Sequence, residues 1–177
     1  MIIISGPSTV GKNPLIYEAC KRFDLEFIIP YTTRSIRTEE VHGIDYFFLT
    51  TNEFQTKIKN KILTEWDYCL DNYYGYAFDF PGTNKQITHS LSRMALRIKQ
   101  KYLENITTVF LMPNDIAQIH YNLKQIYSGK NLYLRQSLVE EELRHSVLFD
   151  KIVVSTNPSK NILENADMKE IFNNMCL

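Results

Sequence analysis

Short apolar runs rich in β-branched residues alternate along this chain with longer segments in which apolar positions recur every three or four residues. Residues 1–4 (MIII) form the first run, and a turn segment and then a helical pattern over residues 14–23 follow it. Apolar runs of this length, bounded by turns, are typical of buried parallel strands. Strands that alternate with helices predict an α/β fold with a mostly parallel sheet between helical layers.

The rest of the chain continues this alternation. We expect further strands over residues 45–49, 62–69, 73–80, 85–91, 107–112 and 152–155. We expect further helices over residues 52–59, 93–103, 116–126, 138–148 and 162–174, with residues 28–40 irregular. Asn52 is the expected N-cap of the second helix. The short strands over residues 62–80 indicate a small sheet beside the main one.

Composition narrows the class of protein. A length of 177 residues suits one domain, residues 1–177, and 20 basic residues balance 20 acidic ones. This balance gives no overall field that favours nucleic acid or an anionic membrane. No apolar run approaches the roughly 20 residues of a membrane-spanning helix. Three widely spaced cysteines form no zinc pattern and favour a reducing, cytoplasmic compartment.

A glycine-bounded loop follows the first strand. Residues 6–12 read GPSTVGK and match the first seven positions of the phosphate-binding P-loop. In such a loop, main-chain N–H groups and the lysine hold the phosphates of a nucleotide. The expected ATP-binding residues are Gly6, Pro7, Ser8, Thr9, Val10, Gly11, Lys12, Asn13 and Pro14.

The eighth position of the pattern holds Asn13, where serine or threonine presents a hydroxyl group to Mg²⁺. The side-chain carbonyl of asparagine also binds hard cations, so Asn13 is the candidate Mg²⁺ ligand. Its reach and charge differ from those of a hydroxyl group. The loop therefore predicts nucleotide binding more strongly than it predicts catalysis.

Two further blocks suggest a second phosphate site. Residues 31–48 read YTTRSIRTEEVHGIDYFF, and residues 65–75 read EWDYCLDNYYG. Arg34 and Arg37, three apart in a loop, could both bind the oxygens of one phosphate monoester. Tyr46 and Tyr74 offer hydroxyl donors and flat faces, and Glu65 could accept two hydrogen bonds from the edge of guanine. In the alternative interpretation, the two tyrosines belong to the core and Glu65 is a surface charge.

These blocks resemble the guanylate kinase family, whose Thr-Thr-Arg, Gly-x-Asp-Tyr and Glu-Trp…Asn-Tyr-Tyr-Gly segments follow a P-loop in this order. With the VFLMP and DKIVV strands of residues 109–113 and 150–154, the similarity spans nearly the whole chain. The resemblance implies a three-layer P-loop NTPase fold with an acceptor-binding subdomain at about residues 31–80 and a lid at about 121–136. It implies that Arg34, Arg37, Tyr46 and Tyr74 bind the acceptor phosphate and Glu65 the base. Arg135, which opens the helix after the lid, would join Lys12 and Arg34 in catalysis.

The chain departs from the family at several functional positions. Pro30 and Tyr76 stand where the family has small hydroxyl residues that read guanine, although Tyr76 still falls within the implied acceptor site. Residues 90–92 (SLS) lack the carboxylates of the family's acidic segment. Within the implied lid, Lys124 and Lys130 could act as point charges beside the single arginine. Residues 155–157 fall where the family contacts adenine.

The residues and the resemblance together indicate an ATP- and Mg²⁺-dependent phosphotransferase acting on a nucleoside monophosphate, GMP or a related phosphate monoester. Two alternatives stay open: a catalytically weak binding module, and a kinase for a non-nucleotide phosphate such as a sugar phosphate. The intact Gly6, Gly11 and Lys12 favour a kinase over a binding module. The cluster Arg93, Arg97, Lys99 and Lys101 reads as the solvated face of a helix, so we expect no nucleic-acid partner.

Overall fold

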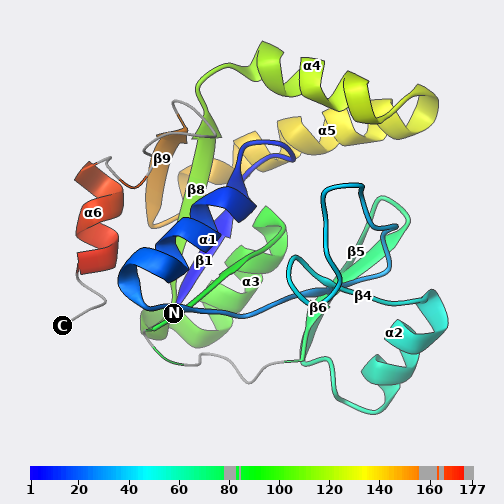
Figure 1. Cartoon of the computed structure of the whole chain (residues 1–177), viewed down its shortest axis with the longest axis horizontal. Coiled ribbons are helices and arrows are strands. Elements are labelled where there is room, and N and C mark those ends of the chain that lie inside the picture. Colours follow the sequence, from blue (N-terminus) through cyan, green and yellow to red (C-terminus); the bar gives the residue numbers. More distant parts are fainter. Residues whose placement is uncertain (78–82, 84, 156–162, 164–165, 174–177) are drawn as a thin grey trace.

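The computed structural model describes residues 1–77, 83, 85–155, 163 and 166–173. A five-stranded parallel sheet forms the centre, in the order β2-β7-β1-β8-β9 (Figure 1). Its strands are β1 (Ile2–Ser5), β2 (Glu26–Phe27), β7 (Gln86–His89), β8 (Thr107–Pro113) and β9 (Lys151–Ser155). Each residue of β1 is buried, as expected for the middle strand of a sheet that is covered on both faces.

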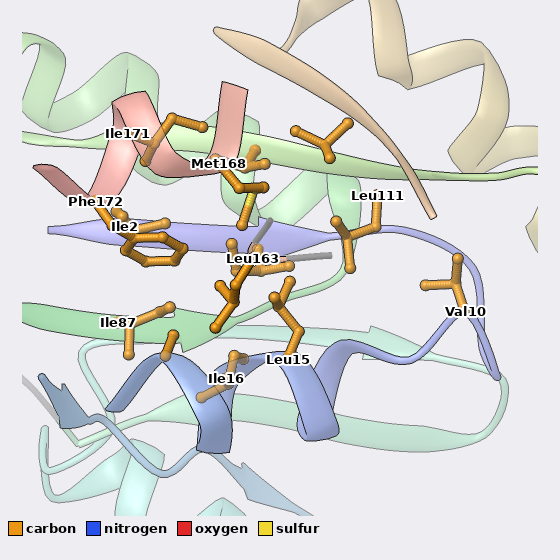
Figure 2. Packing of buried hydrophobic residues seen from close by; sticks show 14 of the residues in the cluster. Ile2, Val10, Leu15, Ile16, Ile87, Leu111, Leu163, Met168, Ile171 and Phe172 are labelled. Atoms are coloured by element: carbon orange, nitrogen blue, oxygen red, sulfur yellow. The ribbon is translucent and has the colours of Figure 1, made fainter. Parts of the chain in front are cut away.

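Helices cover both faces of this sheet. They are α1 (Lys12–Phe23), α3 (Ser92–Tyr102), α4 (Ile116–Ile126), α5 (Gly129–His145) and α6 (Ala166–Asn173), with short 3₁₀ turns at Leu103–Asn105 and Ser146–Leu148. One face packs Ile2 against Ile16 of α1 and Phe172 of α6 (Figure 2). The other face packs Ile3 against Met94 of α3. The alternating side chains of β1 thus join two apolar layers, which confirms the three-layer α/β fold.

A small mixed sheet stands beside the central one, in the order β4-β3-β6-β5. Its strands are β3 (Tyr31–Thr32), β4 (Phe47–Phe48), β5 (Glu65–Cys69) and β6 (Asn72–Tyr76), and α2 (Thr51–Lys59) packs on it. Phe54 of α2 is fully buried, and its ring stacks on Tyr73 at 5.2 Å. The apolar face of α2 therefore packs on one face of the small sheet, and the other face of the small sheet is turned toward the central sheet.

Some sequence expectations were wrong in detail. Thr50, rather than Asn52, caps α2, because the Thr50 hydroxyl group and the Glu53 side chain each bind the other's main-chain N–H. The helix expected over residues 138–148 begins earlier and ends earlier, at Gly129–His145, so residues 128–132 form the N-cap and first turn of α5, and Leu132 packs against the core there. The strand expected over residues 45–49 is limited to Phe47–Phe48. The expected strand over 73–80 and helix over 162–174 extend beyond the described residues.

Neither β2 nor β3 was expected from the sequence. Each is only two residues long, too short for an alternating pattern to be recognised. Among the described helices, none combines the length and the apolar character needed to cross a membrane.

Candidate active site

A cavity of about 370 Å³ opens where the loop after β1 meets the small sheet and α5. Cations outnumber carboxylates among the charged side chains that line it: Lys12, Arg34, Arg37, Arg135, Glu40 and Glu142. Like charges that line one cavity repel one another, and an anion bound between them offsets this repulsion. The lining is therefore suited to a ligand with several negative charges.

The loop after β1 has a backbone that requires glycine. Gly6 and Gly11 have φ angles of 142° and 96°, which other residues rarely adopt. A Cβ atom on Gly6 would also lie 2.5 Å from the carbonyl oxygen of Leu111. Gly11 is the N-cap of α1 and offers no capping side chain, so the first N–H groups of α1 are open to an anion.

Lys12 lies at the base of this loop. Its Nζ donates to the carbonyl oxygens of Gly6 and Pro7, the latter at 2.9 Å. Burial lowers the pKa of Lys12, while the charge of Glu142 raises it. Burial conversely raises the pKa of Glu142, and Lys12 lowers it. Each group thus favours the charged form of the other, and Glu142 counterbalances Lys12 when no phosphate is bound.

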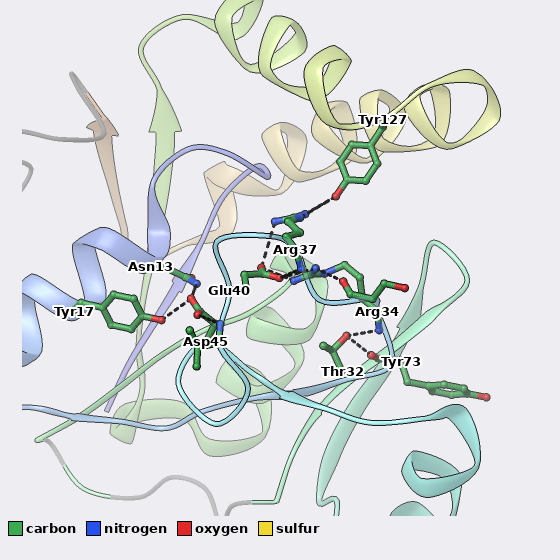
Figure 3. A network of polar contacts seen from close by, with 11 residues as sticks. Asn13, Tyr17, Thr32, Arg34, Arg37, Glu40, Asp45, Tyr73 and Tyr127 are labelled. Carbon is green, nitrogen blue, oxygen red and sulfur yellow. Dashed lines mark hydrogen bonds and ion pairs between the residues drawn. The ribbon is translucent and has the colours of Figure 1, made fainter.

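Asn13 connects the phosphate loop to the small sheet. Its amide Nδ2 donates to Asp45 Oδ1 at 2.8 Å, and the Tyr17 hydroxyl group donates to the same oxygen at 2.7 Å (Figure 3). The main-chain N–H of Val41 donates to the other oxygen of Asp45 at 2.8 Å. This arrangement orients the side-chain amide of Asn13. Its carbonyl oxygen is then one neutral candidate ligand for a metal ion. The described residues contain no group of three or more acidic, histidine or cysteine ligands.

The residues present fit Mg²⁺ only if a bound phosphate compound supplies further oxygen ligands. A cation bound through the Asn13 carbonyl oxygen would complete its shell with phosphate oxygens and water, an arrangement that Mg²⁺ favours. The departure from the usual hydroxyl residue thus changes the ligand and does not by itself remove the site.

Arg34 and Arg37 come from the loop between β3 and β4. The Arg34 guanidinium is buried and donates from Nη1 and Nη2 to the two carboxylate oxygens of Glu40, at 2.9 and 2.7 Å. Its second Nη1–H binds the carbonyl oxygen of Ser35 at 2.7 Å. A guanidinium has five N–H groups, so the edge formed by Nε and Nη2 has no partner among the described residues. That edge matches two oxygens of a phosphate group.

Tyr46 and Tyr74 lie beside these arginines in the cavity lining. The Arg34 guanidinium carbon is 5.3 Å from the centroid of the Tyr46 ring, and the two tyrosine rings are 6.4 Å apart. Burial raises the pKa of both phenols, so both stay neutral hydroxyl donors at physiological pH. The structure thus brings together all four residues that were assigned to the acceptor phosphate.

Glu65 is not brought to this cavity. Its carboxylate is buried and accepts a hydrogen bond from Lys101 of α3 at 2.6 Å, with Arg97 at 3.7 Å. Tyr76 does line the cavity, but its side chain is fully buried and its hydroxyl group donates to the carbonyl oxygen of His89. Glu65, which the resemblance assigned to the base, is therefore ion-paired outside the cavity, and Tyr76, assigned to the acceptor site, forms part of the cavity wall.

Arg135, in the second turn of α5, is 7% exposed and lines the same cavity. Its guanidinium carbon lies 4.0 Å from the centroid of the Tyr127 ring. Its Nε is buried without a hydrogen-bond partner, and no carboxylate among the described residues pairs with it. A buried cation without a counter-charge is costly, so this position is suited to an anionic ligand.

The remaining basic residues singled out in the sequence do not line the cavity. Lys124 and Lys130 are exposed on the helices α4 and α5. The basic face of α3 is engaged by the protein itself, since Arg93 forms two hydrogen bonds with Asp67 and Lys99 lies 3.1 Å from Asp150. Ser155 donates to the carbonyl oxygen of Val10, while residues 156 and 157 lie outside the described residues.

Sequence reasoning missed three lining or neighbouring groups: His89, Glu142 and Tyr127. Glu142 follows Arg135 by seven residues, which is two helical turns, so helix periodicity could have placed both on one face. His89 is the last residue of a buried strand that pairs with β1, and this position puts it beside the phosphate loop. Tyr127 gave no recognisable signal, because its role depends on how two helices meet.

His89 is expected to make the protein sensitive to mild acid. Burial, Lys12 and Arg34 lower the pKa of His89 to about 3, with Asp45 opposing this shift. An unfolded histidine has a pKa near 6.5, so below that pH the unfolded state binds the extra proton. Stability should fall as the pH drops from about 6.5 toward 3. Urea titrations across this window should show a shallower loss for His89→Gln than for the wild type.

The exposed His42 supplies the control for this experiment. The variant His42→Gln should lose stability with falling pH as steeply as the wild type does. Equal slopes for His89→Gln and the wild type would contradict the burial of a neutral imidazole.

Comparison with known proteins places this site in context. A family model described as guanylate kinase matches residues 1–172. The guanylate kinase of Mesomycoplasma hyopneumoniae (strain 7448) is 30% identical, over 97% of this chain and 95% of the relative. The guanylate kinase of Lactococcus lactis subsp. lactis is 31% identical, over 93% of this chain and 86% of the relative.

A solved structure agrees in fold. The crystal structure of guanylate kinase from Anaplasma phagocytophilum superposes with a TM-score of 0.72, at 22% identity, and the match covers 100% of this chain and 86% of the other. At this identity the likeness concerns the fold alone. The five-stranded sheet and the small mixed sheet described above are its shared framework.

Proposed function

Because the chain belongs to the guanylate kinase family, we propose that it transfers the γ-phosphoryl group of ATP to a nucleoside monophosphate. The observation that carries this proposal is the convergence of Lys12, Arg34, Arg37 and Arg135 on one cavity. The phosphate loop, residues 6–12, is suited to the polyphosphate. The loop between β3 and β4 that carries Arg34 and Arg37, here called the arginine loop, faces it from the small sheet. A cavity of this kind suits two phosphate-bearing ligands that meet end to end.

Each group has a role that its position supports. Lys12 would leave the carbonyl oxygens of its own loop to bind the β- and γ-phosphates. Arg34 and Arg37 would hold the acceptor phosphate, with Tyr46 and Tyr74 donating hydrogen bonds to it. Arg135 would neutralise negative charge on the phosphoryl group during transfer. Such electrostatic stabilisation is usually the largest contribution a protein makes to this reaction. The Asn13 carbonyl oxygen would hold Mg²⁺, and the charge of the bound ion would further neutralise the phosphate oxygens.

The reaction needs no general base. An oxygen of the acceptor phosphate attacks the γ-phosphorus, and the bond from that phosphorus to the bridging oxygen of ADP breaks. A phosphate monoester has its second pKa near 6 and is largely a dianion at neutral pH, so no proton has to leave the attacking oxygen. Positioning and charge neutralisation therefore account for the catalysis.

A second candidate, phosphoryl transfer to a non-nucleotide phosphate such as a sugar phosphate, is favoured by one observation. The edge of Arg34 formed by Nε and Nη2 has no partner among the described residues, whereas Glu65 is paired with Lys101 and Tyr76 bonds to His89. GMP would have to displace Lys101 to use Glu65. The acceptor phosphate is thus better supported than the base.

The test is ATP consumption in the presence of Mg²⁺ over a panel of GMP, AMP, UMP, dTMP and sugar phosphates. We expect turnover with GMP or another nucleoside monophosphate. Turnover with a sugar phosphate alone would favour the second candidate. ATP binding without turnover of any acceptor would contradict both and indicate a binding module. If Glu65 reads guanine, Glu65→Gln should lower kcat/KM for GMP and leave the other acceptors unchanged.

A further inference from the structure

Tyr127, at the junction of α4 and α5, reaches across to the arginine loop of the small sheet. Its hydroxyl oxygen accepts hydrogen bonds from Arg37 Nε at 3.1 Å and from Arg37 Nη2 at 2.6 Å (Figure 3). These two N–H groups form the edge of a guanidinium that binds two phosphate oxygens. The hydroxyl oxygen of Tyr127 therefore occupies this edge of Arg37, and an acceptor phosphate would approach Arg37 beside the phenol, through Nη1.

The ring of Tyr127 also faces Arg135. The guanidinium carbon of Arg135 is 4.0 Å from the ring centroid, and that of Arg37 is 5.8 Å from it. The negative face of an aromatic ring attracts a guanidinium, most strongly when water is excluded. One neutral side chain thus contacts both the arginine assigned to the acceptor and the arginine assigned to transfer.

The hydroxyl group of Tyr127 has one hydrogen left to donate. A phenol has two acceptor lone pairs and one O–H donor, and Arg37 takes up the lone pairs. No described residue accepts a hydrogen bond from Tyr127. A phosphate bound near Arg37 would provide that acceptor, and a hydrogen bond to a charged oxygen is among the stronger ones.

We propose that Tyr127 is a positioning residue that joins α4 and α5 to the arginine loop, bridges Arg37 and Arg135, and donates its hydroxyl hydrogen to the acceptor phosphate. This inference rests on the proposed phosphoryl transfer for its last step, whereas the bridge itself exists without any ligand. Residues 121–136 contain only one arginine, and the inference gives a neutral tyrosine part of the role of binding phosphate oxygens there.

Kinetics with ATP, Mg²⁺ and GMP test the hydrogen bond to the phosphate. Tyr127→Phe keeps the ring and removes the hydroxyl group, so KM for GMP should rise about tenfold while kcat stays within about twofold. Tyr127→Leu also removes the ring beneath Arg135, so kcat should fall as well. Tyr133→Phe, at a 69% exposed position of α5, is the matched control and should leave both values unchanged. An unchanged KM in Tyr127→Phe would overturn the contact.

Amide hydrogen exchange of the ligand-free full chain tests the bridge independently of the reaction. Tyr127→Leu should speed exchange in both residues 126–132 and residues 36–46, whereas Tyr133→Phe should leave both segments as in the wild type. Acceleration confined to residues 126–132, or none, would overturn the bridge. If the wild type does not turn over GMP, the function fails for that acceptor, and this exchange result alone decides the inference.

Discussion

Replacing Lys12 by alanine is expected to lower kcat/KM for phosphoryl transfer by roughly 10³-fold. The lysine is the cation that the phosphate loop contributes, and among the described residues its hydrogen-bond partners are two carbonyl oxygens of that loop. Because burial disfavours its charge, its loss should leave the melting temperature close to that of the wild type. Steady-state kinetics and thermal melts of the same preparations check both statements.

Lys21→Ala is the control for this variant, since Lys21 is exposed on the same helix. It should match the wild type in rate and in stability. Wild-type turnover in Lys12→Ala would show that the phosphate loop does not hold the phosphoryl donor.

Replacing Arg135 by leucine is expected to abolish most turnover without weakening the fold. An arginine that neutralises a transferring phosphoryl group contributes roughly 10³-fold or more to kcat. Arg135 is buried with an unpartnered Nε and with its guanidinium against the Tyr127 ring, and no carboxylate among the described residues pairs with it, so an apolar side chain of similar volume removes an uncompensated charge. The free energy of unfolding should therefore stay equal or rise, while kcat falls.

Urea denaturation and steady-state kinetics measure the two effects of this change. Arg144→Leu, at an exposed position of the same helix, should change neither. Arg135→Lys keeps the positive charge but loses the planar guanidinium that can donate two parallel hydrogen bonds. Its kcat should therefore lie between those of the wild type and the leucine variant. A large loss of stability in Arg135→Leu would show that the guanidinium serves the fold and not a ligand.

The sequence predicted the scaffold because it depends on local patterns, and patterns of the same kind led to the two proposed phosphate sites. The buried strand before Gly6 and the helix after it are readable from apolar periodicity, and the spacing of Gly6, Gly11 and Lys12 specifies the loop. Arg34 and Arg37 lie close in sequence, so their meeting at one site follows from a single loop. The structure places both in the lining of the cavity.

The base-reading residues could not be judged from the sequence. Whether Glu65 faces a ligand depends on Lys101, which is 36 residues away on α3 and satisfies its carboxylate. Tyr76 and His89 are likewise 13 residues apart and meet only because β6 approaches the end of β7. Partners of this kind are set by tertiary packing, which no local pattern reports.

Glu40 orders the two side chains of the arginine loop that we propose as phosphate ligands. Glu40 binds Arg34 through both carboxylate oxygens and also accepts from the main-chain N–H of Arg37. A buried pair with this geometry orients the guanidinium at little entropic cost on binding. Glu142 also lines the cavity, and its charge raises the pKa of Lys12. Glu40 thus holds Arg34 and the main chain of Arg37 in position, whereas Arg135 has no carboxylate partner among the described residues.

Calorimetric titration with a bisubstrate ligand, in which adenosine and guanosine are joined through five phosphates, tests most directly whether donor and acceptor share this cavity. Linking two ligands that fit one site end to end makes the second contact intramolecular, so we predict an affinity at least about 100-fold above that of ATP. Arg34→Lys should remove most of this gain while leaving ATP affinity unchanged. An affinity no better than that of ATP would contradict the account, because the arginine loop would then not face the phosphate loop across a shared site.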